Sequence, residues 1–229
     1  MKTKLAFVMV PALAVALGSA ASAQTIYDNG SPDGSNGLSN IRWDSQPLDR
    51  FVADDFVLAG GPGWLVDGVT ISYLWNSGAG LDQSLGFRVI IYRDDAAGGG
   101  PGSVVSDQTV VLGSESLTGD EYFGRPEVVF SVDITPVELD ADTTYWVAMQ
   151  PQGTENGFQL TSGIDNLIGD QVWILYPDIS GPDYVPGSDV FGLLYDASFS
   201  LQGEVIPAPG AMALLAFAGL VGARRRRRK

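Results

Sequence analysis

The sequence contains no cysteine and no histidine. Without cysteine there can be no disulfide bond, so the fold must be stabilised by a hydrophobic core of sufficient size. Without histidine the chain lacks the usual general base and the commonest nitrogen ligand for metals. Serine triads, cysteine proteases, histidine zinc sites and c-type haem attachment are therefore excluded. We expect a protein that is not an enzyme.

Positive charge is scarce between Asp28 and Glu204. All 27 acidic residues of the chain lie in this interval, which contains no lysine and only five arginines: Arg42, Arg50, Arg88, Arg93 and Arg125. The interval therefore carries a net charge of 5 − 27 = −22. Such a surface repels nucleic acid and attracts cations and basic partners. We expect no nucleic-acid partner.

The amino terminus has the pattern of a cleaved signal peptide. Lys2 and Lys4 precede the apolar run Leu5–Leu17, and an A-x-A site follows at residues 21–23. This order predicts export and removal of residues 1–23 as a signal helix, with cleavage by signal peptidase between Ala23 and Gln24.

Residues 205–229 combine prolines, an apolar stretch and a basic end. The stretch Ala211–Ala223 has 13 residues and would be about 20 Å long as a helix. A bilayer core is about 30 Å thick, so this short transmembrane helix would be a marginal permanent anchor. Six cations follow directly and favour the cytoplasmic side: Arg224, Arg225, Arg226, Arg227, Arg228 and Lys229.

This carboxyl-terminal segment resembles a PEP-CTERM sorting signal. Pro207 and Pro209 match the two prolines of the family's element, whereas Ala208 replaces its central glutamate. Ala211–Ala223 matches the hydrophobic stretch and Arg224–Arg228 the arginine cluster. The resemblance implies transient insertion into the inner membrane, processing by an exosortase-type enzyme, and a final place on the cell surface or outside the cell.

Between the two ends, the chain has the alternation of β-strands. Apolar residues recur at every second position in residues 69–75, 87–91, 128–134 and 191–201. Glycine-rich turns separate these segments. Alternation of this kind predicts an all-β domain, a single antiparallel β-sandwich of the jelly-roll type with about eight strands, over residues 24–204.

The same region is similar to an exported sandwich domain that such proteins often carry. The similar pieces are YDNG from Tyr27, ADDFVL from Ala53, FRVIIYRDDAAGGGPG from Phe87 and LDADTTYWVAMQ from Leu139. This similarity implies a fold and no known activity.

One loop offers candidate ligands for calcium. In DNGSPDGSNG, the side chains of Asp28, Asp33 and Asn36 could supply oxygen ligands. Their spacing departs from the EF-hand pattern, and such loops more often form turns through bonds from side chain to backbone. We expect no cofactor other than a structural calcium at this loop, and turn formation without a metal is the alternative.

Two pairs of adjacent acidic residues are candidates for catalysis. Glycosidases use two carboxylates about 5 to 9 Å apart. Asp54 and Asp55 are neighbours on a predicted strand and should point to opposite faces of the sheet. Asp94 and Asp95 follow a strand and open a glycine loop, where turn formation is the simpler explanation. We expect neither pair to be catalytic.

Exposed tryptophans would indicate a sugar-binding face, because their rings stack on the apolar faces of sugars. Trp64 lies in GGPGWLVDG, a predicted loop, and Trp43 is a weaker candidate. Trp75 shares its alternation with Val69, Ile71 and Tyr73, so we expect it in the core.

Taken together, these patterns predict an exported surface or matrix protein with a structural or adhesive role. A carbohydrate-binding module that acts on a polysaccharide is the first alternative. A glycoside hydrolase that uses two carboxylates is the second.

Overall fold

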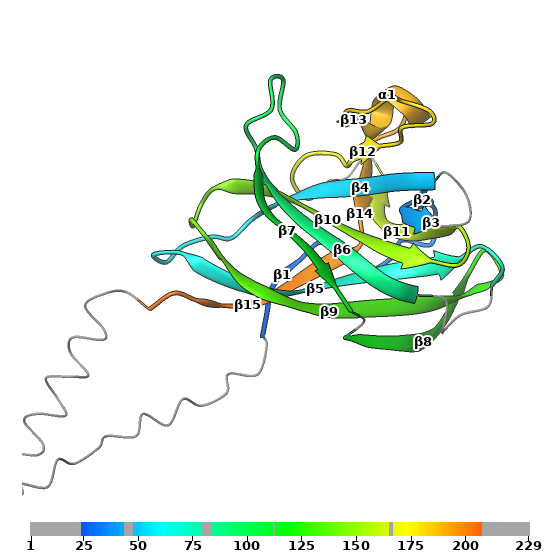
Figure 1. Cartoon of the computed structure of the whole chain (residues 1–229), viewed down its shortest axis with the longest axis horizontal. Coiled ribbons are helices and arrows are strands. Elements are labelled where there is room, and N and C mark those ends of the chain that lie inside the picture. The colour runs from blue at the N-terminus through cyan, green and yellow to red at the C-terminus, as the bar shows by residue number, and fades with distance from the viewer. Residues whose placement is uncertain (1–23, 44–47, 79–83, 112, 165–166, 208–229) are drawn as a thin grey trace, which may run out of the picture.

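The computed structural model describes residues 24–43, 48–78, 84–111, 113–164 and 167–207, which form two β-sheets (Figure 1). The eight-stranded sheet consists of β1 (Gln24–Asp28), β2 (Gly37–Ser39), β5 (Trp64–Trp75), β8 (Ser114–Tyr122), β9 (Arg125–Leu139), β11 (Gly157–Ile164), β14 (Tyr195–Ala197) and β15 (Phe199–Val205). The seven-stranded sheet consists of β3 (Ile41–Trp43), β4 (Leu48–Val57), β6 (Ser84–Arg93), β7 (Val104–Val110), β10 (Thr144–Gly153), β12 (Trp173–Leu175) and β13 (Val185–Pro186).

The prediction of an all-β fold with antiparallel sheets is confirmed. Among the described strand pairs only β10 and β3 run parallel. The expected number of about eight strands was too low. Strands such as β2, β3 and β12 have three residues each, which is too short for an alternating pattern to be recognised.

The main core lies between the two sheets and makes the fold sandwich-like. In β5, Val69, Ile71, Tyr73 and Trp75 all face this core, as their alternation predicted. Rings from the two sheets meet there, since Phe87 of β6 and Phe130 of β9 have centroids 5.0 Å apart. Burial of this apolar surface is the dominant stabilising term for a chain without disulfides.

A second, smaller core covers the outer face of the seven-stranded sheet. Phe51, Ala53, Ile90, Tyr92, Trp146 and Ala148 are buried there, and Trp173, Leu175 and Tyr184 pack on them. In Figure 1 the segment with β12, β13 and α1 (Gly187–Phe191) lies above β4. Strands β4, β6 and β10 are therefore buried on both faces, and their alternation of apolar and polar residues is weak.

The alternation in residues 191–201 does not correspond to one strand. Phe191 ends the helix α1, and Gly192 follows it with a left-handed φ of 73°, which suits glycine at a helix end. Strands β14 and β15 come next and are separated at Ser198. A period of two in apolar residues continued across a helix end and a loop, so the predicted single strand was wrong.

Several predicted segments lie outside the described residues. They are the signal helix of residues 1–23, the apolar stretch 211–223, and Ala208, Pro209 and the arginine cluster. Within the described ranges, no helix is long and apolar enough to cross a membrane.

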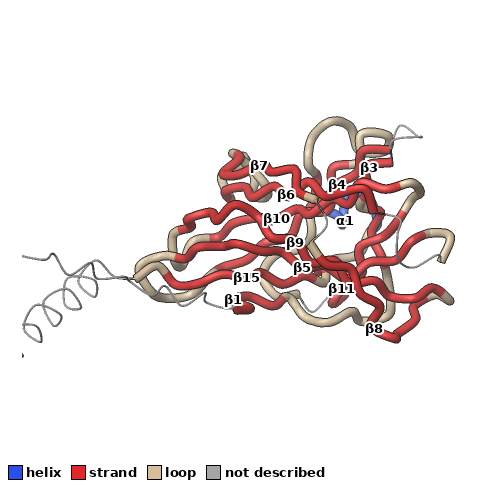
Figure 2. Tube along the Cα trace, turned by 60° about the horizontal axis from the view of Figure 1, so that its bottom comes forward, coloured by secondary structure: helices blue, strands red, loops and turns tan. Residues whose placement is uncertain are grey.

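The first and last described strands meet at one end of the sandwich. Gln24 at the start of β1 pairs with Gly203 of β15, and Val205 pairs with Trp64 at the start of β5. We call this the terminal end. At the opposite end, the hairpin end, β8 turns into β9 where Tyr122 pairs with Arg125. Figure 2 shows β8 lying away from β1 and β15.

Candidate functional site

A groove lies on the outer face of the eight-stranded sheet, toward the hairpin end. Its volume is about 330 Å³. This lies within the range of small-molecule sites, about 300 to 1,000 Å³. Residues of five segments line it: Asp28 at the end of β1 with Gly30–Pro32 after it, Thr70–Ser72 of β5, Thr118, Asp120 and Tyr122 of β8, Glu127 and Val129 of β9, and Ser198–Ser200 at the start of β15. We call it the polar groove.

Strand alternation gives the groove its polar floor. In β5 the core residues Val69, Ile71 and Tyr73 face inward, so Thr70 and Ser72 between them face outward. The neighbouring strands β9 and β15 present polar outward positions in the same way. Six serine and threonine residues line the groove, beside the apolar residues Pro32, Ile71, Val129 and Phe199. The six are Ser31, Thr70, Ser72, Thr118, Ser198 and Ser200.

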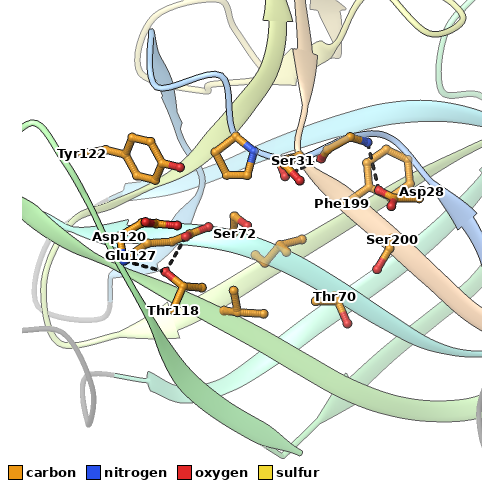
Figure 3. A pocket seen from close by; sticks show the side chains of 15 residues that line it. Asp28, Ser31, Thr70, Ser72, Thr118, Asp120, Tyr122, Glu127, Phe199 and Ser200 are labelled. Carbon is orange, nitrogen blue, oxygen red and sulfur yellow. Dashed lines mark hydrogen bonds between the residues drawn. The ribbon is translucent and has the colours of Figure 1, made fainter.

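The carboxylate of Glu127 lies deep at one side of the groove. The residue is only 3% exposed, and the hydroxyl of Thr118 donates a hydrogen bond to its Oε2 over 2.6 Å. That hydroxyl in turn accepts from the backbone N–H of Asp120 over 3.1 Å. Figure 3 shows Thr118, Asp120 and Glu127 gathered on this side. The hydroxyl of Thr118 therefore fixes the position of the Glu127 side chain.

Tyr122 supplies an aromatic ring beside these acids. Its ring lies close to Gly34, where an added Cβ would stand 3.2 Å from Cε1. Partial burial, and then the negative charges of Glu127 and Asp120, raise the pKa of Tyr122. Its hydroxyl therefore keeps its proton and can donate a hydrogen bond to a ligand.

The other side of the groove is fixed by short bonds between side chains and backbone. Asp28 accepts from the backbone N–H of Gly30 over 3.0 Å, and Ser198 donates to the Gly30 carbonyl over 2.8 Å. On the floor, Gln202 donates to the hydroxyls of Thr70 and Ser200 over 3.2 Å each. The polar groups are thus positioned before any ligand arrives.

The groove carries three carboxylates, from Asp28, Asp120 and Glu127, and no arginine lines it. Hydroxyls, carboxylates and one aromatic ring can bind a ligand rich in hydroxyl groups. The lining therefore offers both hydrogen-bond donors and acceptors to such a ligand.

Neither predicted tryptophan lies in the groove. Trp64 begins β5 at the terminal end, is half-buried against the main core and donates from Nε1 to the carbonyl of Gly60 over 3.1 Å. The expectation that it lies in a loop was wrong. Trp43 ends β3 and is also half-buried against the core. Ligand contact by either ring stays a prediction. Trp75 is fully buried, as predicted.

The calcium candidates form turns in the loop beside the groove. Asp33 accepts from the backbone N–H of Ser35 over 2.8 Å and from the hydroxyl of Thr161 over 3.1 Å. The carbonyl of Asn36 accepts from the same hydroxyl over 3.1 Å. Asp28 makes its own turn and lines the groove. Within the described ranges, no three acidic side chains are grouped so that they could hold a metal ion.

The acidic pair in β4 points to opposite faces, as expected from its position on a strand. Asp54 faces the interior between the sheets and is 1% exposed. Asp55 faces the outer side, where its Oδ1 accepts from the backbone N–H of Asp170 over 2.7 Å. Asp196 is buried near both, and its Oδ1 has no hydrogen-bond partner among the described residues. The sequence interpretation missed this buried cluster, although Asp54 shares its alternation with Val52 and Phe56.

The second acidic pair shapes the glycine loop, as the turn interpretation predicted. Asp94 accepts from the indole N–H of Trp146 over 3.0 Å and from the backbone N–H of Gly100 over 3.1 Å. Asp95 accepts from the hydroxyl of Ser103 over 2.6 Å. Both side chains thus bond to the backbone or side chains in and around this loop.

The groove residues were not found from the sequence. Outward polar positions in 69–75 and 128–134 gave a signal for a polar face, but not for which strands lie side by side on it. No protein-family model and no curated protein matches the chain.

Proposed function

We propose that this protein is exported to the cell surface or extracellular matrix and acts there, without catalysis, as an adhesive protein that holds a glycan in the polar groove. The body would be a jelly-roll-like sandwich. The observation that carries the proposal is the groove itself, where preset hydroxyls, carboxylates and the ring of Tyr122 line one hollow. Sites of this kind, concave with convergent polar groups, are the usual places for small ligands.

The predicted signals at the two ends support the place of action. The last described backbone bond before the Pro-Ala-Pro element runs from the N–H of Ile206 to the carbonyl of Gly63 over 3.0 Å. Pro207, the first residue of the predicted sorting element, is exposed directly after it. An exosortase-type enzyme would therefore work close to the terminal end, and the groove lies toward the other end.

A purely structural role is the other candidate from the sequence. A structural role does not require a groove lined by polar side chains that are already held in place. Packing alone does not call for the carboxylate of Glu127, because an apolar residue at a 3% exposed position would avoid the desolvation of a charge. The groove therefore favours binding over a role in scaffolding alone.

The test is a glycan array, followed by isothermal titration calorimetry, with the protein purified from its native host. Ser72→Leu places an apolar side chain on the groove floor and should abolish binding. Thr109→Leu makes the same kind of change on β7, in the other sheet, and should leave binding intact. A protein that binds no glycan on the array, or whose Ser72→Leu variant binds unchanged, would contradict the proposal. Release of sugar from bound glycans would contradict its non-enzymatic part.

A further inference from the structure

We infer that the polar groove selects glycans that carry protonated amines, that is, amino-sugar polymers, over neutral and acidic glycans. This inference rests on the proposed function and names the ligand class of the same site. It starts from the charges of the lining residues.

The groove is lined by acidic residues, and no basic residue balances their negative charge. Asp28 lies on one side and Asp120 and Glu127 on the other, and no lining residue is basic (Figure 3). The ion pairs given by the described residues, Arg50 with Asp178 and Arg88 with Asp107, lie elsewhere on the seven-stranded sheet and its cover. A uronic acid or sulfated sugar would bring further negative charge into this field and be repelled.

Glu127 is the group that most requires a cationic partner. It is 3% exposed, and its one described hydrogen bond uses only Oε2. A desolvated carboxylate is costly unless it is paired and hydrogen-bonded. An ammonium group can supply both a charge and hydrogen bonds, and such charge-assisted bonds are roughly twice as strong as neutral ones. The sugar hydroxyl of a neutral glycan supplies only the weaker bond.

The rest of the lining favours a sugar over a basic peptide. Six serine and threonine residues line the groove, and the ring of Tyr122 offers an apolar surface. Hydroxyls pair with the ring hydroxyls of a sugar, whereas a lysine side chain presents only methylene groups next to its charge. Carboxylates on both sides of the groove fit a polymer in which the amine repeats from unit to unit.

The test compares three oligosaccharides by calorimetry at pH 6, with the protein from its native host. A glucosamine hexamer should bind roughly tenfold more tightly than an N-acetylglucosamine hexamer, the difference expected for a hydrogen bond to a charged group. A galacturonic acid hexamer should not bind detectably. The preference for the amine should weaken as salt rises, because the pairing is electrostatic.

Matched variants test whether the preference for the amine depends on Glu127 and Asp120. Glu127→Gln should bring both hexamers to similar affinity, and Glu138→Gln, the same change at an exposed position of β9 near the terminal end, should leave the preference intact. Since Glu127 is buried, Asp120→Asn at an exposed position serves as a second variant and should reduce the preference without affecting folding, which a thermal melt would verify.

The outcomes separate this inference from the proposed function. Equal binding of the acetylated and free-amine hexamers would overturn the inference and leave a glycan-binding groove. No binding of any glycan would overturn both. If hexalysine bound as tightly as the glucosamine hexamer and displaced it, the groove would recognise positive charge in general, and the inference would be wrong.

Discussion

The carboxyl group of Asp54 accepts a hydrogen bond from the backbone N–H of Ala197 over 2.7 Å, and this bond joins the two sheets through β4 and β14. The same oxygen accepts from the side-chain amide of Asn29 over 2.9 Å. The other oxygen accepts from the backbone N–H of Asp55 over 3.1 Å. Burial, and then the negative charge of Asp196, raise the pKa of Asp54 well above its usual value. The buried carboxyl group of Asp54 thus connects β4, β14 and the residue that follows β1.

Removal of the Asp54 side chain should destabilise the protein strongly. Asp54→Ala leaves three buried donors without an acceptor, and we expect the free energy of unfolding to fall by about 3 kcal/mol or more. Asp133→Ala, at an exposed position of β9, should change it by no more than about 0.5 kcal/mol. Urea unfolding followed by tryptophan fluorescence measures both. Equal stability of the two variants would show that the bonds of Asp54 contribute nothing.

Stability should fall as the pH rises from 4 to 7. Burial raises the pKa of Asp55 and of Asp196 from 3.8 to about 6. Between pH 3.8 and about 6 the folded protein keeps protons that the unfolded chain has released. The free energy of unfolding therefore falls with each unit by which the pH rises. Solvent screening limits the total effect to about 1 to 2 kcal/mol.

Urea unfolding at pH 4.5, 5.5 and 7 checks this sign. Asp196→Asn removes one of the buried carboxyl groups whose pKa is raised and should reduce the dependence on pH, whereas Asp133→Asn should not. A protein whose stability increases steadily over this range would refute the assignment of protons to the buried carboxyls.

The turn between β8 and β9 should be improved by a substitution. Phe123 and Gly124 form a two-residue hairpin turn with φ of 56° and 70°, and Phe123 is 54% exposed. Turns with two positive φ values favour Asn-Gly, and a left-handed conformation costs other residues about 1 to 2 kcal/mol. Phe123→Asn should therefore raise the free energy of unfolding by about 1 kcal/mol. Leu85→Asn, also at an exposed apolar residue but without positive φ, should bring no such gain. A fall in stability for Phe123→Asn would mean that the packing of its ring outweighs the strain.

Processing at the predicted signals should define both ends of the mature protein. Protein recovered from the medium or surface of the native host should begin at Gln24 and lack Arg224 to Lys229, with its carboxyl end near Pro207. Intact-mass spectrometry with terminal peptide sequencing measures this. Secreted protein that still carries Arg224–Arg228 would rule out processing at the element.

Alternation allowed the inner faces of the long strands to be predicted. Val69 to Trp75 in β5 and Val128 to Ile134 in β9 meet at the main core as expected, because one face of each strand is buried and the other is not. The pattern was less informative in β6, where Ile90 and Tyr92 are buried in the second core. A strand that is covered on both faces has no polar side for the sequence to mark.

The groove could be predicted only in part, for a topological reason. Thr70, Glu127 and Ser200 occupy outward positions that alternation can identify one strand at a time. Their meeting depends on the pairing of β5 with both β9 and β15. Thr70 pairs with Ser131 of β9, which is 131 − 70 = 61 residues further along, and with Ser200 of β15, which is 200 − 70 = 130 residues further along. Short-range patterns contain no information on such long-range pairing.

Strand β15 leads from the groove directly to the residue at which the chain leaves the sandwich. It lies between β1 and β5, and hydrogen bonds to both neighbours run along its length. If a ligand in the groove were pulled against a fixed carboxyl end, the force would act along the strand. The bonds on both sides would then bear the load together in shear, instead of opening one after another. If the protein has the adhesive role that we propose, its fold is oriented to resist tension along the line of stretching.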